Sequence, residues 1–317
     1  MPRPPASRRN SRVTGNGDLI MQVNGPVGII GLGLMGTALS ERLIGAKIPV
    51  IGCDIEPARC ETLKALGGLV ATSVHELACR SGTIVVAVYS GEQVEALFGE
   101  LDSGASSAWP IVICTTTCAP DEIARLAQRA TSLGIPFVEA PISGTSAEVR
   151  EGTATALVAG EIGVINRVGT LLRMICPRSI CVGKIGNASR AKLAINLILH
   201  SNRAALAEGI VFAECLGLDG QAFLNAARES AAYSRVMDSK GDKMLARDFR
   251  PQSHISQTLK DAELILKEAQ RQDLHLPMTL TQAGLLRTAI ELKGPNSDSA
   301  AVIEAIRRRP SSSEVSQ

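Results

Sequence analysis

Short apolar runs alternate with longer stretches of mixed polarity between residues 27 and 182. The runs have the length and β-branched content of buried strands, and the stretches between them carry apolar residues at helical spacing. Strands are predicted over 27–30, 49–53, 84–88, 111–113, 137–140, 155–159 and 180–182, and helices over 61–66, 92–98 and 121–133. Such alternation predicts βαβ units. The fold class is therefore α/β, with an N-terminal Rossmann-type, doubly wound sheet over residues 24–182.

The pattern changes at residue 183. Residues 188–216 contain hardly a helix breaker except Gly209, and their apolar residues recur at helical spacing, which predicts one long helix. Further helices are predicted over 221–231, 258–270, 276–290 and 299–308, with no strand between them. Residues 183–309 should therefore form an all-α substrate and dimerisation domain. Residues 1–23 and 310–317 are predicted to be tails; the first is too polar to fold, and Met21 is a candidate natural start.

Three glycines follow the first strand with the spacing G-x-G-x-x-G. Gly31 permits a tight turn, Gly33 lets the backbone approach a pyrophosphate, and Gly36 lets the next helix pack closely on the strand. The second strand ends in Asp54, whose carboxylate is suited to hold ribose hydroxyls. The predicted cofactor-binding residues here are Gly31, Leu32, Gly33, Leu34, Met35, Gly36, Asp54 and Val88. The spacing favours a bound dinucleotide over a glycine-rich turn without a ligand.

Composition narrows the classes of partner. The chain of 317 residues is 45% hydrophobic and 20% charged, with a formal net charge of +2, so nothing indicates a nucleic-acid surface. No apolar run reaches the roughly 18 residues that a membrane helix needs. The eight cysteines show no CxxC spacing and no histidine cluster, which predicts no metal site and reduced, mostly buried thiols in a cytoplasmic protein. The four histidines receive no role.

Lys192 and Asn196 lie four positions apart on the predicted long helix, so they share one face near the junction of the two domains. A lysine that is partly desolvated beside a nicotinamide has its pKa lowered, and it is then able to exchange a proton with a hydroxyl group. By spacing alone, however, a Lys and an Asn on one helix face are more often solvated surface residues than catalytic ones.

Motifs spread over most of the chain resemble a known family. They are GLGLMG at 31–36, EAPISG at 139–144, EGT at 151–153, the segment 186–196, and KD at 260–261. In order and spacing they resemble the β-hydroxyacid dehydrogenase family, which includes 3-hydroxyisobutyrate dehydrogenases, tartronate semialdehyde reductases and four-carbon sugar-acid dehydrogenases. The resemblance implies a Rossmann-type domain followed by a helical domain, and NAD(P)-dependent hydride transfer to or from a small hydroxy acid.

The resemblance also implies roles for individual residues. Lys192 becomes the general acid/base, and Asn196 helps to hold the substrate. Lys260 lies near the nicotinamide and the substrate, whereas Asp261 is expected to be structural. Thr116 lies in a Ser/Thr pair of the family that precedes a proline, and an N-cap of the following helix is an equal alternative.

Two positions depart from the family, and a third bears on the choice of cofactor. The resemblance implies that Ser143 and Gly144 grip the substrate carboxylate, but Thr145 stands where the family commonly has a second glycine, which affects the substrate size. Ile195 stands where relatives have Asn, or His in 6-phosphogluconate dehydrogenases, and so counts against that activity. Asp54 would repel a 2′-phosphate, so NAD is expected rather than NADP.

Residues 84–100 and 298–303 resemble the L-threonate dehydrogenase branch in particular, which implies a polyhydroxylated four-carbon acid as substrate. An imine reductase and a non-catalytic NAD(P)-binding protein of the same fold are the alternatives, and Lys192 disfavours both. The long apolar helix needs burial on more than one side, which predicts a homodimer or a dimer of dimers.

Overall fold

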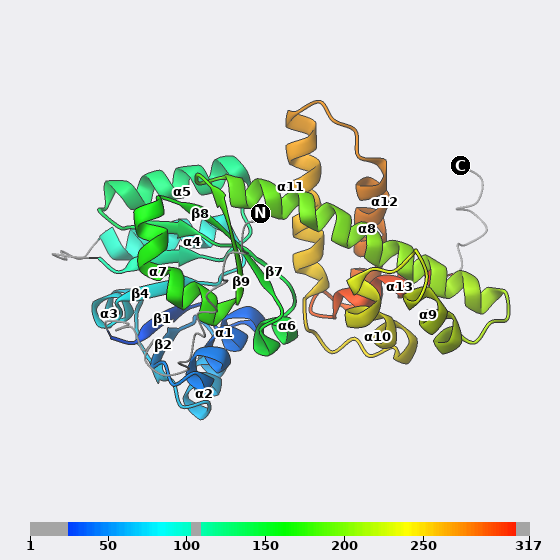
Figure 1. Cartoon of the computed structure of the whole chain (residues 1–317), viewed down its shortest axis with the longest axis horizontal. Helices are drawn as coiled ribbons and strands as arrows, with labels where there is room; N and C mark the ends of the chain where they lie inside the picture. The colour runs from blue at the N-terminus through cyan, green and yellow to red at the C-terminus, as the bar shows by residue number, and fades with distance from the viewer. Residues whose placement is uncertain (1–24, 103–108, 309–317) are drawn as a thin grey trace, which may run out of the picture.

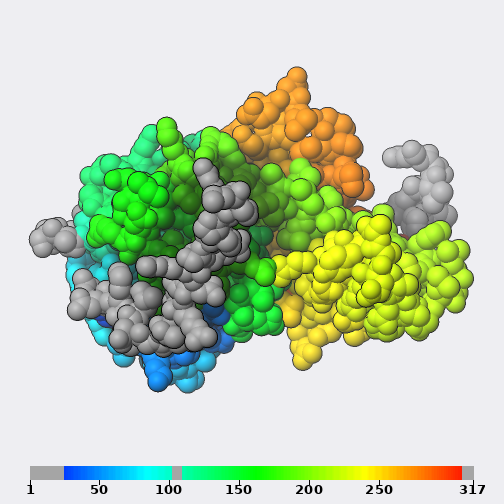
Figure 2. Space-filling view, viewed as in Figure 1, coloured from blue at the N-terminus to red at the C-terminus, as the bar shows by residue number. Residues whose placement is uncertain are grey.

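The computed structural model describes residues 25–102 and 109–308, so the two predicted tails lie outside the described residues. Figure 1 shows a sheet covered by helices at one end of the molecule and a group of helices at the other. One long helix, α8 (Asn187–Cys215), begins beside the sheet and runs through the helical end. In the space-filling view the two ends lie directly against each other (Figure 2).

The described residues form one mixed sheet of nine strands in the order β3-β2-β1-β4-β5-β6-β8-β7, with β9 paired to β8. The strands are β1 (Val27–Ile30), β2 (Val50–Cys53), β3 (Leu69–Val70), β4 (Thr83–Val86), β5 (Ile111–Cys114), β6 (Phe137–Glu139), β7 (Ile142–Ser143), β8 (Thr155–Gly160) and β9 (Arg178–Gly183). The strands from β1 to β6 run parallel, and β8 joins β6 in the antiparallel sense. The strand order reverses at β1, between β2 and β4, which is where α/β sheets of this kind bind ligands.

Helices cover both faces of the sheet. They are α1 (Leu34–Gly45), α2 (Pro57–Ala65), α3 (Val74–Arg80), α4 (Gly91–Asp102), α5 (Pro120–Ser132), α6 (Ser146–Glu151) and α7 (Ile162–Ile175). Successive residues of β1 point to opposite faces: Ile29 packs in a core with α1 and α7, whereas Ile30 packs in a second core with α3, α4 and α5. The doubly wound arrangement expected from the alternation of strands and helices is confirmed.

The second part of the chain is helical around its own core. After α8 come α9 (Gly220–Arg228), the π-helical η1 (Met237–Gly241), α10 (Asp242–Ala246), α11 (Ile255–Arg271), α12 (Pro277–Lys293), the 3-10 helix η2 (Ser299–Ala301) and α13 (Val302–Arg307). Between α8 and α13 the described residues hold no named strand, only an isolated bridge between His254 and Asp298. None of the described helices is long and apolar enough to cross a membrane.

Several elements were not predicted. Helix α7 has buried residues at helical spacing, but Gly163 and Gly169 lie inside it. Glycine destabilises a helix interior, so a sequence with these glycines favours a loop prediction. The helices α3 and α6 and the two-residue strands β3 and β7 are too short to produce a clear period. The helix predicted over 299–308 is in fact η2 followed by α13.

All eight cysteines are free thiols. Only Cys114, Cys118 and Cys176 are fully buried, and three others are exposed, so the expectation that most thiols would be buried was wrong. The apolar sequence around a cysteine does not fix burial, because a strand at the sheet edge such as β9 presents its residues to solvent.

Candidate active site

A cleft of about 990 Å³ opens at the carboxyl edge of the sheet, beside the reversal of strand order, and extends between the sheet and the helical domain. It is lined by most of the residues that the sequence singled out: Gly31, Gly33, Leu34, Met35, Asp54, Val88, Thr116, Ser143, Gly144, Thr145, Lys192 and Asn196. Leu32, Gly36 and Lys260 are not among the lining residues. Leu32 packs in the core of the sheet domain, Gly36 lies against the Gly31 carbonyl, and Lys260 is hydrogen-bonded to the loop at Thr117.

The glycine turn has the geometry that a pyrophosphate requires. Gly31 has φ +87°, and a Cβ there would lie 2.6 Å from the carbonyl oxygen of Ala87. A Cβ on Gly33 would meet nothing within 4 Å, so this position faces open space, whereas one on Gly36 would collide with the Gly31 carbonyl. Gly33 caps α1 without any side-chain hydrogen bond, which leaves the N–H groups of the first turn available to an anion.

Asp54 is joined to the glycine turn. Its Oδ2 accepts a hydrogen bond of 2.6 Å from the backbone N–H of Leu32, and its Oδ1 accepts one of 2.8 Å from the N–H of Glu56. The guanidinium of Arg59 lies 3.3 Å from both carboxylate oxygens. The carboxylate at the end of β2 is therefore fixed beside the turn, with one cation next to it.

Three further candidates, Val88, Thr116 and Lys260, lie at the carboxyl edge of the sheet, and Lys260 joins the two domains there. Thr116 donates its hydroxyl to the carbonyl of Val88 at 3.1 Å, and the N-cap of α5 is Ala119, so Thr116 is not the cap of that helix. Lys260, on α11, donates to the backbone carbonyls of Tyr89 at 3.0 Å and Thr117 at 2.8 Å. Its ammonium group thus holds the helical domain to two loops at the carboxyl edge of the sheet.

Glu139 anchors the helix that presents Lys192. The Glu139 side chain is fully buried, and its carboxylate accepts hydrogen bonds from the backbone N–H groups of Gly186 and Ser189 at the start of α8. A carboxylate there satisfies N–H groups that a helix leaves open and complements the positive end of the helix dipole. The sequence analysis gave Glu139 no role, although an acid inside a buried strand was a usable signal.

Lys192 is buried in the cleft, with 6% of its surface exposed. Burial lowers its pKa to about 8, although the nearby Asp261 carboxylate opposes the shift. Asn196, one turn further along α8, donates its amide to Asp261 Oδ2 at 2.8 Å. Ile195 is exposed and does not line the cleft. Asn196, the next residue, lies on the same face of α8 as Lys192 and lines the cleft with it. The amine therefore loses its proton closer to neutral pH than a solvated lysine does.

The loop after β7 lies across the cleft. Gly144 has φ +148°, and a Cβ there would lie 2.8 Å from the Cβ of Ala154. Thr145 caps α6: its hydroxyl accepts from the N–H of Glu148, and its own N–H donates to the Glu148 carboxylate. Ser143, Gly144 and Thr145 all line the cleft, but the hydroxyl and N–H of Thr145 are occupied by hydrogen bonds within the loop.

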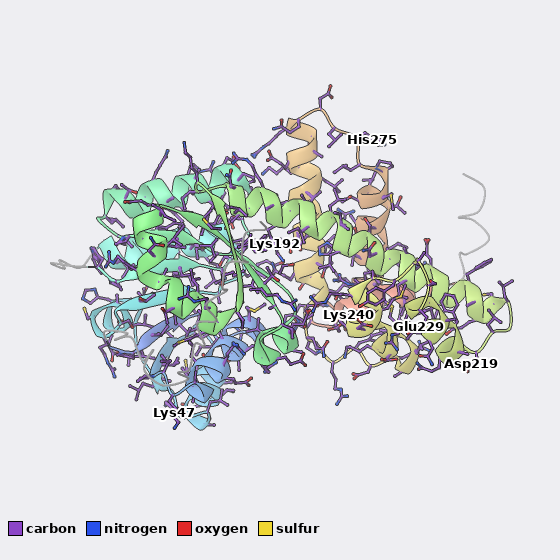
Figure 3. The ribbon with its side chains drawn as sticks, viewed as in Figure 1. Lys47, Lys192, Asp219, Glu229, Lys240 and His275 are labelled. Atoms are coloured by element: carbon purple, nitrogen blue, oxygen red, sulfur yellow. The ribbon has the colours of Figure 1, made fainter. Side chains whose placement is uncertain are left out.

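Three basic residues of the cleft were missed by the sequence analysis. His200 and Arg203 follow Asn196 on the buried face of α8, and both line the cleft. Lys240, on η1, is 1% exposed and pairs with Asp298 at 2.7 and 2.9 Å. Figure 3 labels Lys192 near the junction of the domains and Lys240 further into the helical domain. Among the described residues no group of three potential ligands is arranged to hold a metal ion.

Comparisons with known proteins agree with this geometry. Residues 26–183 match a family model described as the NAD binding domain of 6-phosphogluconate dehydrogenase. Residues 186–306 match one described as the NAD-binding domain of NADP-dependent 3-hydroxyisobutyrate dehydrogenase. The chain is 31% identical to 2-hydroxy-3-oxopropionate reductase of Escherichia coli K12, over 88% of this chain and 96% of that protein. It is 26% identical to L-threonate dehydrogenase of Cupriavidus necator, over 88% and 95%.

Among solved structures, Psf3 in complex with NADP+ and 2-OPP superposes with a TM-score of 0.81 at 25% identity, over 88% of this chain and 99% of that one. A doubly wound sheet with a glycine turn, joined to a helical domain across a cleft that contains a buried lysine, defines a nicotinamide-dependent oxidoreductase. The chain belongs to the β-hydroxyacid dehydrogenase family of NAD(P)-dependent enzymes that act on a CH–OH group.

Proposed function

We propose that the protein transfers a hydride between a small hydroxy acid and NAD, with Lys192 as the general acid/base. The observation that supports this most strongly is the placement of Lys192: a buried amine, with its pKa lowered by burial to about 8, in the same cleft as the glycine turn. An amine that titrates near neutral pH is matched to proton exchange with an alcohol.

Different residues of the cleft would transfer the proton, hold the substrate and join the two domains. A dinucleotide held at the glycine turn would supply the acceptor for the substrate hydride in oxidation and its donor in reduction. Lys192 takes the hydroxyl proton as the carbonyl forms, and in reduction it returns that proton. Ser143 and the backbone of Gly144 hold the substrate carboxylate, and Asn196 orients the substrate beside Lys192 while bonded to Asp261. Lys260 keeps the two walls of the cleft together.

NAD is the proposed cofactor, rather than NADP. The Asp54 carboxylate, held by the N–H of Leu32, is suited to accept hydrogen bonds from ribose hydroxyls and repels a 2′-phosphate. Arg59 beside it reduces this repulsion. The ratio of kcat/KM with NAD to kcat/KM with NADP therefore tests the proposed cofactor preference.

The wider proposal is a cytoplasmic homodimer, or a dimer of dimers, built from a dinucleotide domain at 24–182 and a helical domain at 183–309. Large apolar side chains are exposed on α8 and at its C-cap: Ile195, Ile198, Phe212 and Leu216. A second copy of the chain would cover them. The eight free thiols suit a reducing compartment.

The test is a spectrophotometric screen of NAD and NADP reduction. The panel contains L-threonate, D-erythronate, 3-hydroxyisobutyrate, glycerate and 3-hydroxypropionate. Lys192→Met keeps the apolar stem of the side chain and should lower turnover by about 10²- to 10⁴-fold with NAD binding retained. Lys267→Met, the same change on the exposed face of α11, is the control and should match the wild type.

Near-normal turnover by Lys192→Met contradicts the assignment of the acid/base. Turnover of cyclic imines but of no hydroxy acid would favour the imine reductase alternative. Binding of NAD without turnover of any compound would favour a non-catalytic role.

A further inference from the structure

The buried face of α8 carries polar side chains well beyond Lys192. Asn196, His200 and Arg203 follow it at intervals of four, four and three residues, and all four side chains line the cleft. At a rise of about 1.5 Å per residue, the backbones of Arg203 and Lys192 lie about 16 Å apart along the helix axis. The guanidinium of Arg203 lies closer to the reacting end, because it contacts Thr258, one turn of α11 from the Asp261 that binds Asn196. The polar wall of the cleft is therefore much longer than a single proton-transfer site needs.

Arg203 is a buried cation without a carboxylate partner. It is 6% exposed, and its one hydrogen bond among the described residues runs from Nη1 to Thr258 Oγ1, at 3.5 Å. Its Nε has no partner. Burial lowers its pKa to about 10, and the more distant Asp298 and Asp261 oppose the shift. A buried charge of this kind costs free energy unless a ligand of opposite charge completes the site.

The neighbouring cations of the cleft differ in this respect. Lys240 forms a closed ion pair with Asp298, and Arg235 pairs with Glu148 at 3.0 Å. Each of these cations is already neutralised by a carboxylate of the protein. Arg203 therefore keeps N–H donors that can bind a ligand, whereas those of Lys240 and Arg235 are paired with carboxylates of the protein.

Three of the seven unpartnered buried side-chain atoms of the described residues lie on this face of α8. Asn196 Oδ1, His200 Nδ1 and Arg203 Nε are all buried without a hydrogen-bond partner, on three successive turns of one helix. Burial lowers the pKa of His200 far below its usual value, helped by Arg203 and Lys192, so its ring is neutral at pH 7. Buried polar groups are rarely left unsatisfied, and three in a row on residues that line one cavity point to a bound polar ligand.

We propose that Arg203, flanked by His200, is a second anion-binding subsite, and that the natural substrate is a hydroxy dicarboxylate rather than a hydroxy monocarboxylate. This inference rests on the proposed dehydrogenase function. The first carboxylate is held at Ser143 and Gly144, the carbinol lies at Lys192, and the second carboxylate reaches along α8 to the guanidinium of Arg203. Arginine suits this role because its planar group binds carboxylates through two parallel hydrogen bonds.

A matched pair of substrates tests the subsite. 3-Hydroxyisobutyrate and 2-(hydroxymethyl)succinate share the same reacting carbon and first carboxylate, and they differ by one added carboxylate. The wild type should have the higher kcat/KM for the diacid. Arg203→Met should lower kcat/KM for the diacid by about 10- to 100-fold, the effect of one lost charge-assisted interaction, and change the value for the monoacid by less than about threefold.

Two variants serve as controls. Arg203→Lys should keep part of the diacid preference. Arg287→Met removes an exposed arginine that pairs with Glu263 on α11 and α12, away from the cleft, and should leave both values unchanged. A wild type that prefers the monoacid, or an Arg203→Met variant that loses both activities equally, would overturn the proposal.

A binding experiment separates this inference from the proposed function. Methylsuccinate and isobutyrate are the unreactive counterparts of the two acids. Methylsuccinate should raise the Tm of the wild type and not that of Arg203→Met, whereas isobutyrate should act on both alike. Arg203→Met without ligand should unfold at or above the wild-type Tm, because an unpaired buried charge has been removed.

A clear fall in that Tm would make Arg203 a structural residue and overturn the subsite. If the screen of hydroxy acids found no turnover, the proposed function would fail, but the difference in Tm with methylsuccinate would still decide the role of Arg203.

Discussion

The amide of Asn196 donates a hydrogen bond of 2.8 Å to Oδ2 of Asp261, and this contact joins α8 to α11 one helical turn from Lys192. The other oxygen of Asp261 lies 3.6 Å from the ammonium group of Lys260, which in turn holds the loops of the sheet domain. Asp261 was expected to be structural, and it does join two helices. It also sets the electrostatic environment of Lys192, because its negative charge favours the protonated amine.

The pH dependence of the reaction should report the amine of Lys192. Burial lowers its pKa to about 8, and the deprotonated amine is the base in oxidation. The kcat/KM for oxidation should therefore rise as the pH increases through about 8. For reduction it should fall over the same range, since the ammonium form is then the proton donor. Initial-rate assays of oxidation and of reduction from pH 6 to 10 give the two kcat/KM profiles. A profile that does not change with pH would contradict the role of Lys192.

Asp261→Asn should move that profile to lower pH. The Asp261 carboxylate raises the pKa of Lys192 against the effect of burial, so removal of its charge lets the pKa fall further. Asparagine keeps the size of the side chain and an oxygen for Asn196. The matched control is Glu263→Gln, a half-exposed carboxylate on the same helix, which should not shift the profile. A shift toward higher pH in Asp261→Asn would refute this electrostatic account.

Alanine should lower cofactor affinity at one glycine of the turn and stability at another. A Cβ on Gly33 meets no protein atom, so Gly33→Ala should fold normally and lose NADH affinity by about 10- to 100-fold, because the methyl group occupies the phosphate space. A Cβ on Gly36 collides with the Gly31 carbonyl, so Gly36→Ala should lose about 1–3 kcal/mol of stability. Urea denaturation and NADH fluorescence titration separate the two. Equal loss of stability in both variants would show that the turn is not organised in this way.

Asp298→Asn should destabilise the helical domain by about 3–5 kcal/mol, because it leaves the Lys240 ammonium buried without a partner. The free energy of unfolding from urea titrations measures the effect. Burial lowers the pKa of Lys240 to about 8, so above that pH the amine is neutral in the native state and the loss should be smaller. The double variant with Lys240→Met should recover much of the loss. A single variant as stable as the wild type would mean that the buried pair contributes nothing.

Prediction from sequence succeeded where the signal is local. The glycine spacing at 31–36 fixes a turn, an open phosphate position and a close helix contact, and each follows from backbone geometry within six residues. The strands of the Rossmann-type sheet and the long helix α8 were also evident, because hydrophobic period and length depend only on neighbouring residues. Prediction failed for α7, where the glycines outweighed the apolar spacing, and for the one- and two-turn elements.

The candidate site divides in the same way. The sequence by itself determined the class of fold, the dinucleotide turn and, through motif spacing, the identity of Lys192 and Asn196 as candidates. Only the tertiary structure decided the burial of Lys192, the anchoring of α8 by Glu139, the junction of Asn196 with Asp261, and the unpaired state of Arg203. These properties depend on desolvation and on charges brought together from distant segments. No local pattern encodes either of them, because both arise only when the helical domain packs against the carboxyl edge of the sheet.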